Sequence, residues 1–272
     1  MDQGLILPRP YIGFILSAVQ NRPTFPAPRP PPGHRQGPEL CTACAARVLS
    51  VCAAIEHCDL QRLAAIVTDH RVNPHKTLVA EGDPADGFFN ITEGVVKVYK
   101  LLADGRQQIT GFLFPGDFIG LSSNERYAYS AEAITEVRYC RFPRKPLEKL
   151  LADFPKMETR LRDIASNELA AAQDQMLLLG RKTARERVSS LLLLLSRRAA
   201  KVGTPDNPVM LPMTRTDIAD YLGLTVETVS RTFTQLRKEG LIELRSIGEV
   251  RLRDRAALGN LAEGAEIESP RP

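Results

Sequence analysis

The sequence predicts an α+β protein in which a rolled antiparallel sheet is followed by one long helix and then by a small domain built on two helices joined by a tight turn. Three observations predict this order. Short apolar runs between turn residues fill the first half of the chain, an apolar heptad pattern follows residue 155, and helix-cap signals surround Gly223. With 272 residues and 43% hydrophobic content, the chain is long enough for two folded domains.

The N-terminal segment has the composition of a solvated tail. Seven of the 20 prolines fall between residues 23 and 38, so we expect residues 1–38 to be a disordered, proline-rich tail. The apolar stretch before it is interrupted by Pro8, Arg9 and Pro10, and it lacks a basic start. We therefore expect neither a transmembrane helix nor a signal peptide, no membrane partner, and a cytoplasmic location.

Residues 63–152 have the texture of a small sheet. Apolar runs at residues 88–91, 95–102 and 111–114 are separated by glycine-containing turns. Regular turns between short runs predict antiparallel strands that close or roll up and leave an interior. We expect this segment to be a β-roll preceded by a cysteine-rich segment, residues 39–62.

Residues 153–180 predict a long helix with an apolar seam. Apolar residues follow one another in steps of four, three, four and three at Ala165, Leu169, Ala172, Met176 and Leu179. The other face offers Leu161, Ile164 and Leu177. The helix could pack only on its own domain, but two apolar faces favour a homodimer in which one face lies on the sheet and the seam on a second copy.

Residues 181–255 predict a winged helix-turn-helix. Thr183 and Glu186 form a capping box before a helix that contains residues 191–195, and Thr214 with Asp217 repeats the pattern before a short helix that Gly223 ends. Thr225 then caps a second helix. Two short strands flanking residues 246–249 resemble a wing, and residues 256–272 are expected to be a tail.

The second helix has a polar face that suits the DNA major groove. Arg231 can donate two hydrogen bonds to guanine, Glu227 can accept one from cytosine, and Ser230 can contact a base or a phosphate. A solvated helix face is the plainer interpretation, but a glutamate would be repelled by bare phosphates, so its place here favours base reading of double-stranded DNA. Further candidate DNA contacts are Thr214, Arg215, Thr225 and Thr228. Backbone attraction is expected from Arg181, Lys182, Arg185, Arg187, Arg237, Lys238, Arg245, Arg251 and Arg253.

Residues 214–231, TRTDIADYLGLTVETVSR, resemble the signature of the Crp/Fnr transcription regulators. The resemblance extends over residues 41–252 and includes the segments QITGF at 108–112, PGDFIG at 115–120 and DQMLLL at 174–179. It implies a cyclic-nucleotide-binding-like jelly roll as sensor domain, a dimerisation helix and a DNA-binding domain. In the Fnr branch, the residues that match Glu227, Ser230 and Arg231 read a site like TTGAT-N4-ATCAA.

The cysteines are candidate ligands. Cys41, Cys44 and Cys52 lie close together in sequence and Cys140 lies far away, and thiolates suit zinc and iron-sulfur clusters alike. The resemblance implies a [4Fe-4S] cluster held by these four residues, whose loss in oxygen would weaken DNA binding. A local zinc knuckle that includes Cys58 and His57, or free thiols, are the alternatives.

Other functions have less support in the sequence. The segment YAYS at 127–130 lacks the arginine expected of a cyclic-nucleotide phosphate pocket, although Arg126 is close, and we expect no cyclic nucleotide. No nucleophile-base pair or phosphate loop indicates an enzyme. The resemblance implies that the turn at residues 104–106 contacts RNA polymerase, and an ordinary hairpin turn is the simpler interpretation. The net charge of +4 is too small to decide between these functions.

Overall fold

The computed structural model describes residues 41–121, 125–246 and 248–264. The proline-rich tail expected over residues 1–38 lies outside them. At the start of the described chain, short helices carry the cysteine-rich segment: η1 (Ala45–Leu49), η2 (Val51–Ala54), η3 (His57–Asp59) and α2 (Leu60–Ala64). The buried Ser50 caps η2, since its hydroxyl accepts a hydrogen bond from the Cys52 amide at 3.2 Å.

Two four-stranded antiparallel sheets form the predicted β-roll. One has the order β1 (Thr68–Val72), β8 (Val137–Pro143), β3 (Gly87–Glu93) and β6 (Phe118–Ile119); the other has the order β2 (Thr77–Val79), β7 (Ser130–Ala133), β4 (Val96–Leu101) and β5 (Gln107–Leu113). Ile91, Val96 and Val137 are fully buried in the core that both sheets share. Gly94 turns the chain between β3 and β4 with φ +84°, where a Cβ atom would lie 2.1 Å from the carbonyl oxygen of Glu136.

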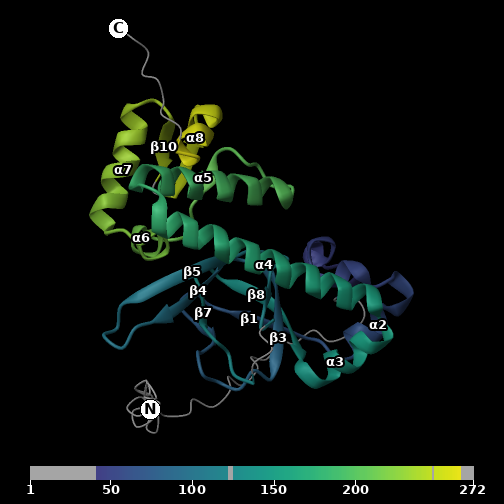
Figure 1. Ribbon diagram of the computed structural model, residues 1–272. Coiled ribbons are helices and arrows are strands. Elements are labelled where there is room, and N and C mark those ends of the chain that lie inside the picture. The colour runs from purple at the N-terminus through teal and green to yellow at the C-terminus, as the bar shows by residue number, and fades with distance from the viewer. Residues whose placement is uncertain (1–40, 122–124, 247, 265–272) are drawn as a thin grey trace, which may run out of the picture. The chain divides into compact units, whose positions relative to one another are not determined.

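Two helices follow the roll: α3 (Arg144–Asp153) and the long helix α4 (Pro155–Arg181). Pro155 begins α4, where the missing amide hydrogen is not needed. The N-terminal part of α4 lies beside η2, and its Met157 and Leu161 share one core with Val51 of η2 (Figure 1). Neither α4 nor any other helix among the described residues is long and apolar enough to cross a membrane.

The expected inner face of α4 was wrong at one position. Leu161 and Ile164 do pack inward, but Leu177 is 57% exposed and its neighbour Leu178 is buried instead. At about 100° per residue, Leu178 returns to within roughly 40° of Ile164 around the helix, whereas Leu177 lies about 140° away. Leu177 was assigned to the inner face although only its neighbour Leu178 lies there, because one step along the helix changes the face by about 100°.

The C-terminal domain is the predicted winged helix-turn-helix. Its elements are α5 (Ala184–Lys201), β9 (Val209–Met210), α6 (Arg215–Leu222), α7 (Val226–Lys238), β10 (Ile242–Ser246), β11 (Glu249–Leu252) and α8 (Arg255–Ala262). Thr183 and Glu186 make both hydrogen bonds of the predicted capping box at the start of α5. Leu192 of α5 and Leu222 of α6 are fully buried in the core of this domain.

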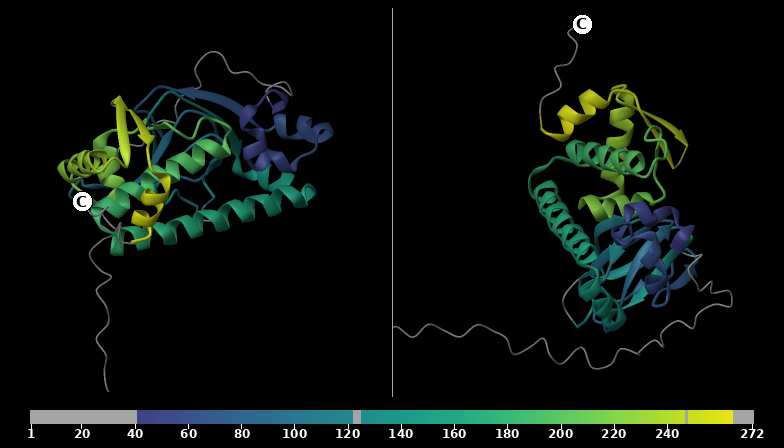
Figure 2. Two further views of the ribbon diagram at one scale, coloured as in Figure 1. Left: turned by 90° about the horizontal axis from the view of Figure 1, so that it is seen from above. Right: turned by 90° about the vertical axis from the view of Figure 1, so that its right-hand side faces the viewer.

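Two parts of this domain extend the prediction. The wing has a third strand, because β9 pairs with β11. Helix α8 occupies residues that we expected to belong to a tail: Asp254 caps it, and it buries Leu258 and Leu261 beside α5 (Figure 2). The domain therefore continues through α8 and does not end at residue 255.

Candidate DNA-reading surface and cysteine site

Local capping sets the start of each helix of the helix-turn-helix. The hydroxyl of Thr214 accepts a hydrogen bond from the Asp217 amide at 3.1 Å, and the Asp217 carboxylate accepts one from the Thr214 amide at 2.9 Å. Burial opposes ionisation of Asp217, but hydrogen bonds from Thr214 and Lys97 hold its pKa below the usual value. Gly223 ends α6 in the left-handed conformation with φ +61°, and Thr225 caps α7 by accepting from the Thr228 amide at 3.1 Å. The sequence pattern thus fixes the turn between the helices.

Helix α7 has one buried face and one exposed face. Val229, Phe233 and Leu236 are buried in the core of the domain. The predicted reading residues Glu227, Ser230 and Arg231 all lie on the exposed face. Since the inner face is anchored by packing, the outer face presents its polar groups in a fixed orientation.

Glu227 and Arg231 form a salt bridge one turn apart, with both side chains mostly exposed. An exposed pair at this spacing contributes only about 0.3–0.5 kcal/mol, so either side chain can exchange its partner for a base edge. The Ser230 hydroxyl donates to the carbonyl oxygen of Val226 at 2.9 Å and retains acceptor capacity. The face therefore offers a carboxylate, a hydroxyl and a guanidinium within two turns.

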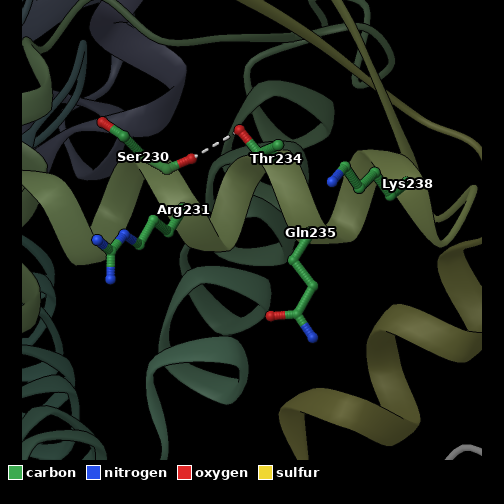
Figure 3. A pocket seen from close by; sticks show the side chains of 5 residues that line it. All are labelled: Ser230, Arg231, Thr234, Gln235 and Lys238. Atoms are coloured by element: carbon green, nitrogen blue, oxygen red, sulfur yellow. Dashed lines mark hydrogen bonds between the residues drawn. The ribbon is translucent and has the colours of Figure 1, made fainter.

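An open hollow of about 420 Å³ continues this face toward the end of α7 (Figure 3). It is lined by Ser230, Arg231, Thr234, Gln235 and Lys238. The Thr234 hydroxyl donates to the carbonyl oxygen of Ser230 at 3.0 Å. The sequence reasoning did not assign Gln235 or Lys238 to this face, although their spacing of four and seven residues from Arg231 indicates it.

The other candidate DNA contacts lie around the two caps. Thr214 and Thr225 are exposed and Thr228 is partly buried, and their hydroxyls take part in the capping bonds. The Arg215 guanidinium lies 3.6 Å from the centre of the Phe233 ring, and burial lowers its pKa. A DNA contact by these four residues stays a prediction.

Seven of the basic side chains around α7 fall into two groups. Arg185, Arg245 and Arg253 form salt bridges with acidic residues of the same domain. Four exposed basic side chains form no salt bridge with any residue that the structure describes: Arg181, Arg237, Lys238 and Arg251. The second group is available to phosphate groups without first losing an acidic partner.

The four candidate ligand cysteines come from two distant segments. Cys41, Cys44 and Cys52 lie on or next to η1 and η2, whereas Cys140 lies in the middle of β8 opposite Asp69 and Asn90. Cys41, Cys52 and Cys140 belong to the core that Met157 and Leu161 of α4 also enter. We call Cys41, Cys44, Cys52 and Cys140 the cysteine site.

The thiols of the cysteine site influence one another electrostatically. Burial raises the pKa of Cys52 to about 12, against the lowering effect of its hydrogen bond with Ser50, and Cys41 and Cys44 add to the increase. Burial also raises the pKa of Cys140, to which Cys52, Cys44 and Cys41 contribute. Such charge effects fall off with distance and agree with the core that Cys41, Cys52 and Cys140 share. Ligation requires thiolates, so a metal bound here displaces protons.

An unpartnered buried amide lies on the same sheet as the cysteine site. Asn90 is 1% exposed, pairs with Cys140 across β3 and β8, and its Oδ1 atom has no hydrogen-bond partner in the described structure. Cys58, in contrast, is exposed and contacts Asp59. Among residues 41–121, 125–246 and 248–264, no three His, Cys, Asp or Glu side chains are arranged around a single metal-ion position. The chemistry of the donor set, four thiols in one partly buried region, fits an iron-sulfur cluster.

Tyrosine side chains occupy the interior of the roll near residue 120. The Tyr127 hydroxyl donates to the carbonyl oxygen of Gly87 at 2.8 Å and lies 3.3 Å from its amide, and burial raises the pKa of Tyr127 to about 12. The Tyr129 hydroxyl accepts from the Gly120 amide at 3.1 Å. Arg126 is exposed and donates to the carbonyl oxygen of Gly82. These tyrosines satisfy backbone amides that could otherwise bind an anion.

Comparison with known proteins agrees with this architecture. Residues 69–154 match the cyclic nucleotide-binding domain family, and residues 186–261 match the Crp-like helix-turn-helix domain family. The second match covers all but the last residue of α8. The solved structure of FixK2 from Bradyrhizobium japonicum is similar, with a TM-score of 0.68 and 38% sequence identity, and the match covers 75% of this chain and 100% of that one. The predicted β-roll, long helix and winged helix-turn-helix are therefore confirmed.

Curated relatives match over most of their own length. The chain is 44% identical over 201 residues to the transcriptional activatory protein AadR of Rhodopseudomonas palustris, covering 74% of this chain and 84% of the relative. It is 40% identical to the nitrogen fixation regulation protein FixK of Bradyrhizobium diazoefficiens, covering 79% and 88%. It is 38% identical to the transcriptional activator protein FnrL of Cereibacter sphaeroides, covering 80% and 90%.

Proposed function

The chain belongs to the Crp/Fnr family of DNA-binding transcription activators, and from that premise we propose that it is an oxygen-responsive regulator controlled by a [4Fe-4S] cluster. As a homodimer under low oxygen, it binds a two-fold DNA site of the form TTGAT-N4-ATCAA. The observation that supports the proposal is that Cys41, Cys52 and Cys140 lie in the core that Met157 and Leu161 of α4 enter, where η2 contacts α4. A change at the cysteines can therefore reach the helix that would pair two copies.

The reading chemistry follows from the exposed face of α7. Arg231 donates to guanine O6 and N7, Glu227 accepts from cytosine N4, and Ser230 contacts a neighbouring base or phosphate. Their position in the first two turns is where a recognition helix meets base edges. Exposed basic side chains, among them Arg237 and Lys238, add the sequence-independent attraction to phosphates.

The dimer surface that we propose is the seam of α4. Leu169 is 62% exposed and Met176 is 65% exposed, and the seam residues Ala165 and Ala172 are small and exposed. Leu179, at the end of the seam, is partly buried against the core of the winged domain. A second copy of α4 fits this seam best, because an alternating apolar repeat is complementary to itself and the alanines permit close approach.

Leu169→Asp is expected to convert the protein to a monomer, since a buried charge on each side of a two-fold seam costs several kcal/mol. Sedimentation velocity on anaerobic protein measures the change. Asn167→Asp adds the same charge to an exposed position on the opposite side of α4 and should leave the dimer intact. Equal behaviour of the two variants would contradict the seam.

The residues of the cysteine site would hold the cluster through four thiolates, and when bound the cluster supplies a covalent link that oxygen can destroy. The chain's own contacts carry the signal from there. Ala54 and Cys52 of η2 pack in the core that Leu161 of α4 enters, and Glu56 forms a 3.5 Å salt bridge with Lys156. Release of Cys140 from the N-terminal segment loosens this side of α4. Coupling of about 1–3 kcal/mol suffices for such a switch.

Two further properties belong to the proposal. The turn at residues 104–106 presents Arg106 paired with Asp104 next to the exposed Leu101 and Leu102, and we assign it the contact with RNA polymerase. The β-roll binds no cyclic nucleotide, since Tyr127 and Tyr129 already occupy backbone amides of its interior.

Cyclic AMP and cyclic GMP, each at about 1 mM, are expected to leave the midpoint of thermal unfolding unchanged. A ligand that binds only the native state must raise this midpoint, and we expect neither nucleotide to bind. Differential scanning calorimetry checks this. A rise of several degrees that saturates with nucleotide concentration would contradict the assignment.

The proposed function is tested by titrating the anaerobic protein with a palindromic TTGAT-N4-ATCAA duplex and with a scrambled duplex, and repeating both titrations after exposure to air. We expect tight binding only to the palindrome and a loss of at least about tenfold in affinity after air. An equal affinity before and after air would reject oxygen control and leave a DNA-binding regulator with zinc or no cofactor.

A further inference from the structure

The guanidinium of Arg187 lies where α4, the link to α5 and the turn of the helix-turn-helix meet. Its Nη2 atom donates to the carbonyl oxygen of Leu179 at 2.9 Å, and its Nε atom donates to that of Lys182 at 2.8 Å. Its Nη1 atom donates to the carbonyl oxygen of Leu222 at 2.7 Å and lies 3.4 Å from that of Gly223. One side chain thus joins the end of α4 to the end of α6.

The acceptors explain why an arginine is needed here. The last carbonyl groups of a helix have no partner within the helix and form its negative end. Leu179 and Leu222 belong to the last turns of α4 and α6, so two negative helix ends converge on one cation. A planar guanidinium has donors that point in fixed directions, whereas a lysine ammonium would satisfy the same charge without fixing the angle.

The backbone of Gly223 also lies close to two side chains at this joint. A Cβ atom added to Gly223 would lie 3.1 Å from Leu179 Cδ2 and 3.4 Å from Arg187 Nη1. Helix α7 begins at Val226, three residues after Gly223. Gln175 of α4 adds a second link, since its Nε2 atom donates to the carbonyl oxygen of Tyr221 at 2.8 Å. Arg187 therefore contributes to the orientation of α7 relative to α4 together with Gln175 and the packing of Leu179.

We propose that Arg187 is a positioning residue that sets which spacing of DNA half-sites the dimer accepts. The proposal rests on the proposed function, in which α4 pairs two copies and α7 reads each half-site. In such a dimer, the separation of the two recognition helices depends on the angle at the joint between α4 and the helix-turn-helix. Adding one base pair between half-sites moves them apart by about 3.4 Å and rotates them by roughly 34°, so a rigid joint distinguishes the spacings.

Arg185 provides a matched control on the same helix. It lies two residues before Arg187 and forms a salt bridge with Glu239, which follows α7. This contact lies wholly within the winged domain, so its loss affects that domain without releasing α4. Arg187→Gln and Arg185→Gln each remove one positive charge. Arg187→Lys retains the charge but loses the planar guanidinium with its fixed donor directions.

The experiment measures the affinity of anaerobic protein for duplexes with the N4 spacer, with spacers one base pair shorter and longer, and with a single half-site. Wild type should prefer N4, and Arg185→Gln should keep that preference. Arg187→Gln and Arg187→Lys should lower the ratio of affinities for the N4 duplex and the other spacers by about tenfold. Both variants should bind the single half-site with the affinity of wild type.

Each other outcome has a distinct meaning. An unchanged N4 preference in both Arg187 variants would overturn the positioning role. So would an equal loss on every duplex, the single half-site included, because it shows that Arg187 only stabilises the winged domain. If wild type itself shows no preference among the spacers, the two-fold reading in the proposed function fails instead.

Discussion

Replacing Arg231 with alanine is expected to reduce binding to the palindromic duplex by about 1–3 kcal/mol per half-site and to relax the preference at one guanine. The structure gives the reason: the guanidinium is exposed on the outer face of α7 and its only salt-bridge partner among the described residues is Glu227. Because that pair is weak, its loss has little effect on stability. Fluorescence anisotropy on duplexes with each base at the guanine position measures the effect.

Arg237→Ala is the control for this prediction. Arg237 is also exposed on α7 but lies outside the reading face. If Arg237 contacts a phosphate, Arg237→Ala should weaken binding to all sequences alike. It should also reduce the slope of log affinity against log salt concentration by about one. If Arg231→Ala behaved in the same way, with equal losses on specific and random DNA, base reading by Arg231 would be ruled out.

Cys140→Ala is expected to abolish cluster assembly and the low-oxygen DNA binding that depends on it. Cys140 is the one member of the cysteine site that comes from the β-roll, so without it the remaining thiols can no longer tie the N-terminal segment to β8. The change removes one sulfur from a strand and retains the backbone ladder. Iron and sulfide analysis of anaerobically purified protein measures the loss.

Cys58→Ala is the matched control, since Cys58 is exposed and contacts Asp59. It should retain wild-type iron and sulfide. The assignment of ligands is contradicted if Cys140→Ala retains the cluster, and a local site within residues 41–58 is indicated if Cys58→Ala loses it.

Local signals in the sequence predicted the helix boundaries well. Thr214 with Asp217, Thr183 with Glu186 and the left-handed Gly223 are determined by residues within a few positions of one another. Physical rules for caps act over that same range, which is why they could be applied without a structure. The alternation of apolar runs and turns in the β-roll is local in the same sense.

Features that depend on distant partners were missed. Helix α8 is short and has a weak pattern of its own, and it is defined by Leu258 and Leu261 packing beside α5. Arg187 was assigned to phosphate attraction because its charge is visible in the sequence, whereas the carbonyl groups it binds come from the ends of two other helices. Leu177 was assigned to the inner face that Leu178 occupies, because the sequence alone does not distinguish adjacent leucines.

The cysteine site lies between these cases. The short spacing of Cys41, Cys44 and Cys52 is visible in the sequence, but their approach to Cys140 depends on how η2 packs on the β-roll and on α4. Only the family resemblance indicated the fourth cysteine in advance. The structure adds the burial of Cys140, the mutual effects on thiol pKa values and the unpartnered Asn90 on the adjacent strand.

In the proposed function, the cysteine site holds an oxygen-labile cluster that controls DNA reading by α7. The most direct test is the visible absorption spectrum of anaerobically purified protein, recorded with its iron and sulfide content and followed after air is admitted. The predicted result is a broad iron-sulfur absorption with iron and sulfide in the ratio of a [4Fe-4S] cluster, which bleaches in air. A colourless protein that contains stoichiometric zinc, or neither metal, would contradict it.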